Sequence, residues 1–301
     1  MQKIQLMCDA ASDFMYDEAK ELGISLRLVP ITHGNDQYKE GILPKEEFID
    51  ILENSPIMPS TAQISPDNLL QGFKEAYEDG CTHIIVVTIS STGSGMYQNC
   101  FIAKELFEAE YGEDKIHFDF IDSRAYTYCY GDRLREAAQM VKEGKTAEEI
   151  VEYLHDKLSR ISGCAGVYSL KFARKSGRIS GAAAFAGEAL GLKPIIHLVN
   201  GKVNIAEKVR GEKNIIPKLI EMAKREADDI ENQDITIFYG RPPQGELERL
   251  IEAVETQLKP KSYKLGLLGA SLTLNAGPAT LGFTFYSKRR EDQYAEYKKK
   301  D

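Results

Sequence analysis

Paired cysteines are missing from this sequence of 301 residues. The five cysteines are odd in number, and none belongs to a C-x-x-C pair; they are Cys8, Cys81, Cys100, Cys129 and Cys164. A disulfide framework needs an even set of cysteines, and structural zinc sites usually take theirs from closely spaced pairs. The pattern therefore argues against both and predicts reduced, mostly buried thiols of a cytosolic protein.

Long apolar runs and an excess of basic residues are also missing. No stretch approaches the roughly 20 apolar residues of a transmembrane helix, and the apolar start at residues 1–6 is too short for a signal peptide. The formal net charge is −8, so no broad basic surface is expected for nucleic acid or anionic lipid headgroups. We expect a cytoplasmic protein with at most transient membrane contact.

The common nucleotide, esterase and metal motifs do not occur either. There is no G-x-x-x-x-G-K-[ST] loop, and Gly93-Ser94-Gly95 lacks both the third glycine of a dinucleotide fingerprint and the spacing of a G-x-S-x-G elbow. No two histidines have the spacing of metal ligands; they are His33, His83, His117, His155 and His197. We therefore expect no metal, no cofactor and no catalytic residues.

Strand-like and helix-like segments alternate along the chain, which predicts an α/β fold. Strands are expected at 4–8, 26–31, 83–88 and 116–121, and later at 193–198, 235–239, 264–268 and 283–286. Helices are expected from Ser65 to Gly80, from Ser94 to before Gly112, at 125–144 and from Thr146 to about Ser162. Asn200-Gly201 predicts a β-hairpin turn.

These elements predict two α/β domains. Residues 1–160 form the first domain, a mainly parallel sheet flanked by helices that carries the candidate anion-binding loops. Residues 161–290 form the second domain, a mixed sheet with helices, and 291–301 is a charged tail. The segment 181–192 is expected to be a buried helix whose small residues leave room beside Phe185 or, alternatively, pack closely in the core.

Two hydroxyl-rich loops are candidate anion sites. The strand at 83–88 runs into Ser90–Gly95, where loop amides, hydroxyls and a following helix N-terminus would meet at the carboxyl end of a parallel strand. In the second loop Ser65 is explained as a helix cap, whereas Thr61 and Gln63 have no local role. Ordinary loop residues remain the alternative interpretation of both segments.

Two further segments have structural explanations that compete with binding. After the first strand, Ser12 or Asp13 is expected to cap the next helix, with Asp9 accepting from loop amides. The basic residues at 171–178 are typical of a solvated face, although their position beside a small-residue stretch suggests recognition of a phosphate-bearing partner.

Seven motifs in order resemble the DegV family of bacterial fatty-acid-binding proteins, which includes the binding subunits of fatty-acid kinase. They are Asp9-Ala10-Ala11-Ser12-Asp13, Pro59-Ser60-Thr61-Ala62-Gln63, Ser90-Ser91-Thr92-Gly93-Ser94-Gly95-Met96-Tyr97-Gln98, Asp122-Ser123, Lys175-Ser176-Gly177-Arg178-Ile179, Lys193-Pro194-Ile195 and Ala276-Gly277-Pro278. Any one of them is weak, but seven in the family's order cover nearly the whole chain.

The resemblance implies a lipid-binding protein, not an enzyme. A long-chain fatty acid would lie between the two domains, and a separate fatty-acid kinase would phosphorylate its carboxylate. Thr61 and Ser94 would hold the carboxylate, with Gly95, Gln63, Ser91 and Asn275 beside them. The tail would contact Phe185, Ala184 and Leu190, and Arg178 and Arg210 would face the kinase. A monomer is expected.

The sequence departs from the family pattern near its end. Where the family usually has His-x-Gly-Pro-Gly, this chain has Asn275-Ala276-Gly277-Pro278-Ala279, so the charge of a protonated histidine and one permissive backbone position are missing. The departure puts the pairing with a kinase in question and keeps two alternatives open. One is a carrier of another anionic lipid or phosphorylated small molecule, and the other is a serine esterase or thioesterase that uses Ser94.

Overall fold

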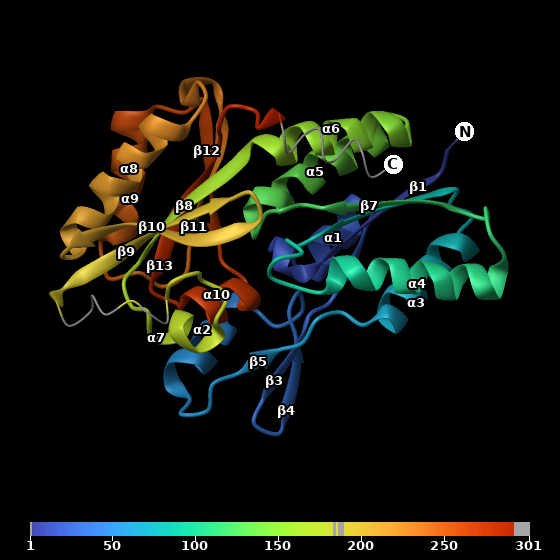
Figure 1. The fold of residues 1–301 in the computed structure, drawn as a ribbon, viewed down its shortest axis with the longest axis horizontal. Coiled ribbons are helices and arrows are strands. Elements are labelled where there is room, and N and C mark those ends of the chain that lie inside the picture. Colours follow the sequence, from blue (N-terminus) through green and yellow to red (C-terminus); the bar gives the residue numbers. More distant parts are fainter. Residues whose placement is uncertain (1, 183–184, 186–189, 292–301) are drawn as a thin grey trace.

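Two β-sheets lie side by side in the computed structural model, which describes residues 2–182, 185 and 190–291 (Figure 1). The first sheet belongs to the N-terminal part of the chain and the second to the C-terminal part. The chain leaves the last helix of the first unit at Arg160 and enters the second sheet at Ile161. How far the two units are independent domains stays a prediction.

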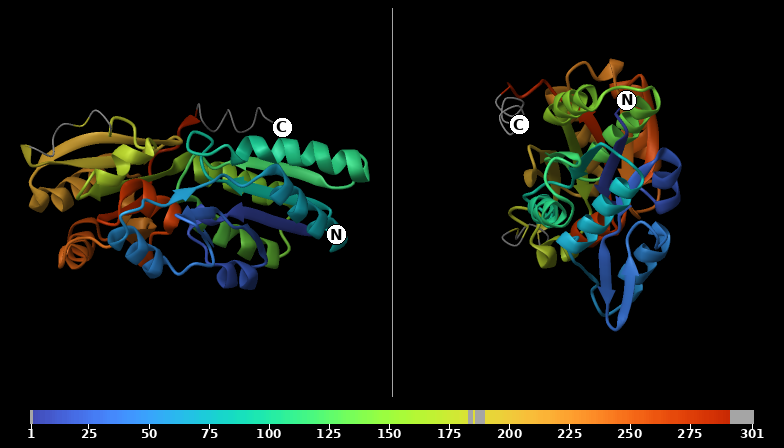
Figure 2. Two further views of the ribbon diagram at one scale, coloured as in Figure 1. Left: turned by 90° about the horizontal axis from the view of Figure 1, so that it is seen from below. Right: turned by 90° about the vertical axis from the view of Figure 1, so that its right-hand side faces the viewer.

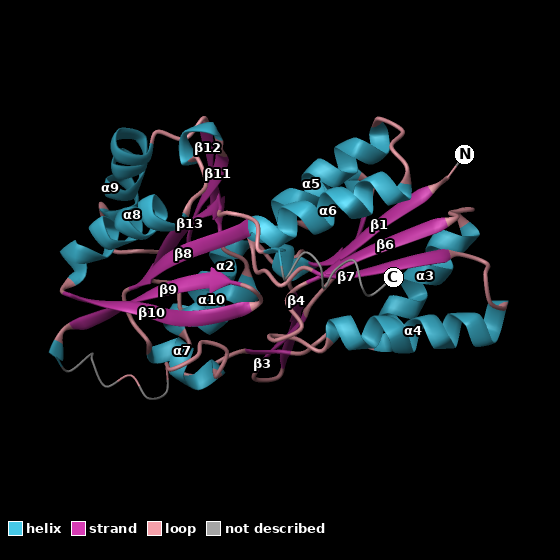
Figure 3. Ribbon diagram, turned by 45° about the horizontal axis from the view of Figure 1, so that its top comes forward, coloured by secondary structure: helices cyan, strands magenta, loops and turns pink. Residues whose placement is uncertain are grey.

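The first sheet has four parallel strands in the order β2-β1-β6-β7. They are β1 (Ile4–Asp9), β2 (Ile24–Arg27), β6 (His83–Thr88) and β7 (His117–Asp122). Helices α3 (Pro66–Glu78) and α4 (Met96–Tyr111) cover one face, and α5 (Tyr128–Lys142) and α6 (Ala147–Arg160) cover the other (Figure 3). Because both faces are covered, β6 is an almost continuous run of buried apolar residues.

Local capping signals set the ends of two of these helices as predicted. The Ser65 hydroxyl accepts the amide of Asn68 at the start of α3. At the start of α6, Thr146 and Glu149 form both bonds of a capping box. The prediction for Ser12 and Asp13 was wrong, because helix α1 (Tyr16–Leu22) has no side-chain cap.

The second sheet has six strands in the order β10-β9-β8-β13-β11-β12, of which only β11 and β12 pair in parallel. They are β8 (Ile161–Val167), β9 (Leu192–Val199), β10 (Lys202–Arg210), β11 (Asp234–Tyr239), β12 (Ser262–Leu267) and β13 (Thr280–Tyr286). Helices α8 (Ile215–Glu226) and α9 (Glu246–Ala253) lie on one face. The short helices α7 (Lys171–Ser176) and α10 (Ala270–Ala276) lie on the other (Figure 3).

The predicted Asn200-Gly201 hairpin joins β9 to β10, and both residues have positive φ, 48° and 76°. Two other expectations for this half need correction. The helix α6 ends at Arg160, and Ser162 belongs to β8. Half of the helix expected at 181–192 falls outside the described residues, and its last residue, Leu192, begins β9.

A small antiparallel sheet, absent from the sequence prediction, projects beneath the two larger ones (Figures 1 and 2). It contains β3 (Pro30–His33), β4 (Asp36–Lys39) and β5 (Ser60–Thr61), and helix α2 (Lys45–Asn54) follows β4. The strand predicted at 26–31 is therefore wrong, because β2 stays in the parallel sheet while β3 joins the small one. Pro30 has no amide to donate and stands at the first position of β3, where that loss is tolerated.

The α/β fold class predicted from the sequence is confirmed. One hydrophobic cluster contains buried residues of both larger sheets, and a second lies between the six-stranded sheet and α8 and α9. All five cysteines are buried and unpaired. Among the helices that the structure describes, none combines the length and the hydropathy needed to cross a membrane.

Candidate ligand-binding cavity

A cavity of about 700 Å³ lies between the first sheet and the second. This volume is typical of sites that bury a small organic ligand. The loops that follow β6 and precede α3 form one end of the cavity. Strands β8 to β11 and helix α10 form the other. The two ends differ in chemistry, because the first is rich in hydroxyls and amides and the second is mostly apolar, with Ser271, Asn275 and Thr280 as polar members.

The polar end brings together the residues that the sequence singled out. Thr61 on β5, Gln63 after it, and Ser94 and Gly95 before α4 all line the cavity. The Gln63 side chain lies directly against Gly95, since a Cβ built on that glycine would be 2.2 Å from the Gln63 Oε1. The Ser94 hydroxyl oxygen accepts the Met96 amide at 3.3 Å, which leaves its proton for a ligand.

The backbone amides of this loop are mostly engaged, contrary to the sequence expectation. The amides of Gly93 and Ser94 donate to the carbonyl of Ser90, at 2.9 and 3.2 Å. The amide and the hydroxyl of Ser91 both donate to the carboxylate of Asp122. The groups at this end that could bind an anion are the Thr61 and Ser94 hydroxyls, the Gln63 amide and the positive N-terminus of α4, a helix of 16 residues.

Charged groups are few on the cavity wall. Among the described lining residues, Asp9 and Arg178 are the only charged ones, and none is a histidine. Asp9 is buried and accepts from the Ala11 and Ile89 amides and the Tyr130 hydroxyl. Burial raises the pKa of Asp9, and these hydrogen bonds oppose that shift. Arg178 is exposed and donates to the carbonyl of Ser176.

The apolar wall was not identified from the sequence. It comes mainly from three neighbouring strands and from α10; its residues are Ala165, Val167, Ile196, Leu198, Val203, Phe238, Leu268, Leu272 and Ala276. Alternation along β8 points Ala165 and Val167 to the cavity, while Cys164, just before Ala165, packs in the other cluster. The alternation of side chains along β8 could be predicted from the sequence, but which of its two faces borders the cavity could not.

Two of the three residues predicted for the ligand tail, Phe185 and Leu190, are not on the cavity wall. Phe185 is buried but is not among the lining residues, and Leu190 is 67% exposed. Ala184 lies outside the described residues. Asn275 does line the cavity, and its amide donates to the Ser271 carbonyl. Arg210 is exposed at the end of β10 and does not reach the wall.

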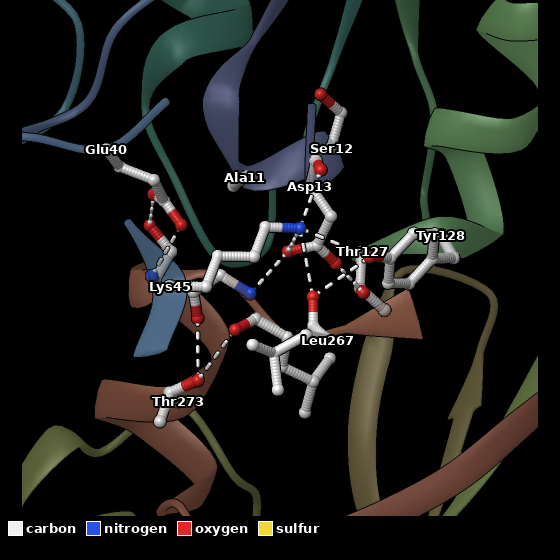
Figure 4. A network of polar contacts seen from close by, with 12 residues as sticks. Ala11, Ser12, Asp13, Glu40, Lys45, Thr127, Tyr128, Leu267 and Thr273 are labelled. Carbon is white, nitrogen blue, oxygen red and sulfur yellow. Dashed lines mark hydrogen bonds and ion pairs between the residues drawn. The ribbon is translucent and has the colours of Figure 1, made fainter. Parts of the chain in front are cut away.

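Beside the cavity, a buried polar network joins the two units (Figure 4). The Asp13 carboxylate accepts the Thr127 hydroxyl and the Gly269 amide. Lys45 lies 3.8 Å from the same carboxylate and donates to the carbonyl of Leu267. Burial raises the pKa of Asp13, while Lys45 lowers it. The two units are thus joined by the bond from the Gly269 amide to Asp13 and by the bond from Lys45 to the Leu267 carbonyl.

Glu40 makes a second contact of this kind. Its carboxylate accepts both the amide and the hydroxyl of Ser271. Burial, together with the nearby Asp13 carboxylate, raises the pKa of Glu40 to about 7, although the bonds from Ser271 act to lower it. Glu40 and Asp13 approach each other at Gly269, where a Cβ would lie 2.6 Å from both carboxylates.

Comparisons with known proteins agree with this architecture. Residues 3–288 match the family model described as "Uncharacterised protein, DegV family". A DegV domain-containing protein from Caldanaerobacter subterraneus subsp. tengcongensis, TTE1491, is 29% identical over 289 residues, which cover 96% of this chain and all of that protein.

Solved structures show the same fold. The structure of a fatty-acid-binding DegV family protein from Thermus thermophilus superimposes with a TM-score of 0.83 at 25% identity, covering 95% of this chain and all of that one. The fatty-acid-binding DegV family protein SAG1342 from Streptococcus agalactiae gives 0.81 at 25% identity, covering 96% and 100%. The match to the family model spans nearly the whole chain, and this protein belongs to the DegV family.

Proposed function

We propose that this protein binds one long-chain fatty acid, with the carboxylate at the Thr61–Ser94 end of the cavity and the tail along β8 and β9. The observation that carries the proposal is the division of a single cavity of about 700 Å³ into a hydroxyl-rich end and an apolar end. The Thermus thermophilus and Streptococcus agalactiae relatives, which have the same fold, are described as fatty-acid binding.

The energetics of the cavity suit such a ligand. Burying an acyl chain gains roughly 0.8 kcal/mol per methylene, so a long chain offers on the order of 10 kcal/mol before the costs of binding. A carboxylate buried without partners would cancel much of this gain. The Thr61 and Ser94 hydroxyls, the Gln63 amide and the N-terminus of α4 supply donors, so no lysine is needed at that end.

We further propose that the protein is a carrier that presents the carboxylate to a separate fatty-acid kinase. Ser94 has no histidine beside it among the described residues of the cavity wall, and the only carboxylate there, Asp9, is occupied by three hydrogen bonds. Those contacts disfavour an esterase. Arg178 is exposed at the cavity and Arg210 at the end of β10, where a partner could reach both.

Lipid analysis of the purified protein tests the proposal. Native mass spectrometry should show a non-covalent adduct, and solvent extraction should release a fatty acid of equal mass. Incubation of delipidated protein with octadecanoic acid should restore the adduct. If the protein releases a lipid of another class, that lipid is the ligand and the proposed fatty acid is not. A delipidated protein that takes up no fatty acid would refute the proposal.

A further inference from the structure

The β9–β10 turn reaches from the second unit onto the carboxylate loop of the first. The carbonyl of Gly201 accepts hydrogen bonds from the hydroxyls of Ser90, at 2.8 Å, Tyr126, at 2.9 Å, and Thr92. On its other side, the Gly201 amide donates to the carbonyl of Arg124 at 2.7 Å. Gly201 of the C-terminal unit therefore contacts four residues around the polar end of the cavity.

The three hydroxyls form a compact group around this carbonyl. Ser90 and Thr92 lie 3.0 Å apart and Thr92 and Tyr126 lie 3.1 Å apart, measured between their oxygens. A carbonyl oxygen has two lone pairs and each hydroxyl has one proton, so at most two of the hydroxyls donate to Gly201 at one time while the third donates to a neighbouring hydroxyl. Ser90 is completely buried and Tyr126 is 6% exposed. Withdrawal of the turn would leave the buried Ser90 and Tyr126 hydroxyls without this acceptor.

The same residues fix the position of Ser94. The Ser90 carbonyl receives the amides of Gly93 and Ser94, which defines the bend of the loop. The Tyr126 side chain packs against that bend, since a Cβ built on Gly93 would lie 2.9 Å from the Tyr126 ring and hydroxyl. Tyr126 also lines the cavity. A shift of the turn is therefore transmitted through Ser90 and Tyr126 to the hydroxyl that faces the ligand.

We infer that the Asn200-Gly201 turn is a positioning element for the carboxylate site, acting through Ser90, Thr92 and Tyr126. The Ser90–Gly95 loop has its binding geometry only while the C-terminal unit, residues 161–290, packs against it. A carboxylate and an acyl tail are therefore recognised together. The inference rests on the proposed fatty-acid function and adds to it that the bonds of Thr92 and Tyr126 to Gly201, made at the cavity wall, help to set the affinity for the carboxylate. A carrier built in this way releases the carboxylate when the two units separate.

The test compares two probes that differ only at the head, octadecanoic acid and octadecanol. The variants are Thr92→Val and Tyr126→Phe, which each remove one hydroxyl and keep the shape, and Thr92→Ser, which keeps the hydroxyl. Matched controls are Thr256→Val and Tyr263→Phe, whose hydroxyls bond to Glu252 and Glu255 on the exposed surface. Kd is measured for each probe, and the thermal midpoint confirms folding.

Loss of one hydroxyl should raise the Kd for octadecanoic acid roughly 5- to 10-fold, because one hydrogen bond of ordinary strength is lost. The Kd for octadecanol should change less than about twofold, and Thr92→Ser and both controls should match the unmodified protein. Equal losses for acid and alcohol would overturn the inference, because they would show a role in cavity shape alone. An unmodified protein that binds neither probe would instead refute the fatty-acid function itself.

Tyr126→Phe changes a buried residue and could lower stability. Thr92 is exposed, so Thr92→Val carries the test if the tyrosine variant does not fold. If Thr92→Val leaves the Kd for octadecanoic acid unchanged, and therefore equal to that of Thr92→Ser, the positioning role is refuted.

Discussion

Two serines of one loop, Ser91 and Ser94, should respond to mutation in opposite ways. The Ser91 hydroxyl donates to Asp122, whereas the Ser94 hydroxyl faces the cavity and only accepts, from the Met96 amide. Ser94→Ala should therefore weaken fatty-acid binding and leave folding nearly unchanged. Ser91→Ala should destabilise the fold and leave the affinity nearly unchanged.

The magnitudes follow from the kind of bond that is lost. A hydrogen bond to a carboxylate contributes about 1.5–3 kcal/mol, so Ser94→Ala should raise the Kd for octadecanoic acid roughly 10- to 150-fold. Thr61→Val, which keeps the shape of the side chain, should have an effect of the same order. In Ser91→Ala the lost bond to the buried Asp122 should lower the free energy of unfolding by about 1–3 kcal/mol.

Two assays separate these outcomes. Calorimetric titration of delipidated protein with octadecanoic acid gives the Kd, and urea unfolding of the same samples without ligand gives the free energy of unfolding. Glu248→Ala, a change on the exposed surface of α9, is the control for both assays. If Ser91→Ala weakens binding as much as Ser94→Ala, or if Thr61→Val leaves Kd within about twofold, the proposed carboxylate site is wrong.

Three further predictions concern the cavity wall, the polar network and the partner. Ala165→Phe should shift the preference towards shorter acyl chains, because Ala165 lines the apolar end; an unchanged ranking of C12 to C18 acids in a displacement assay would contradict this. Glu40 has a pKa of about 7 in the fold, above its ordinary value, so folding favours its protonated form and stability falls as pH rises. Urea unfolding should show a loss of about 1 kcal/mol between pH 6.5 and 8, and Glu40→Gln should abolish that slope. Arg210→Glu should slow acyl-phosphate formation by a fatty-acid kinase roughly 5-fold or more with unchanged fatty-acid Kd, and an equal rate would remove Arg210 from the docking surface.

Elements with strong local signals were predictable from the sequence. The apolar run of β6, the Ser65 and Thr146 caps and the Asn200-Gly201 turn each depend on neighbours in the chain. Their formation needs no knowledge of the rest of the fold. For this reason the alternation of these elements was enough to predict an α/β protein with a parallel sheet in its first half.

The small sheet that carries Thr61 was not predictable in the same way. Strand β5 has two residues and exists because Thr61 pairs with Ile31, thirty positions earlier. A strand of two residues has no periodicity to detect. The sequence therefore pointed to Thr61 only through its lack of a local role and through the family resemblance.

The sequence by itself determined the alternation of strands and helices in the two larger sheets, a cysteine pattern that argues against zinc and disulfide frameworks, and the hydroxyl-rich loops. Only the tertiary structure decided which loop hydroxyls are available, because Asp122 takes that of Ser91 and Gly201 takes those of Ser90 and Thr92. These partners are brought close by packing of the sheets and not by spacing along the chain. Identical side chains in one loop thus acquire different roles from contacts that no local pattern encodes.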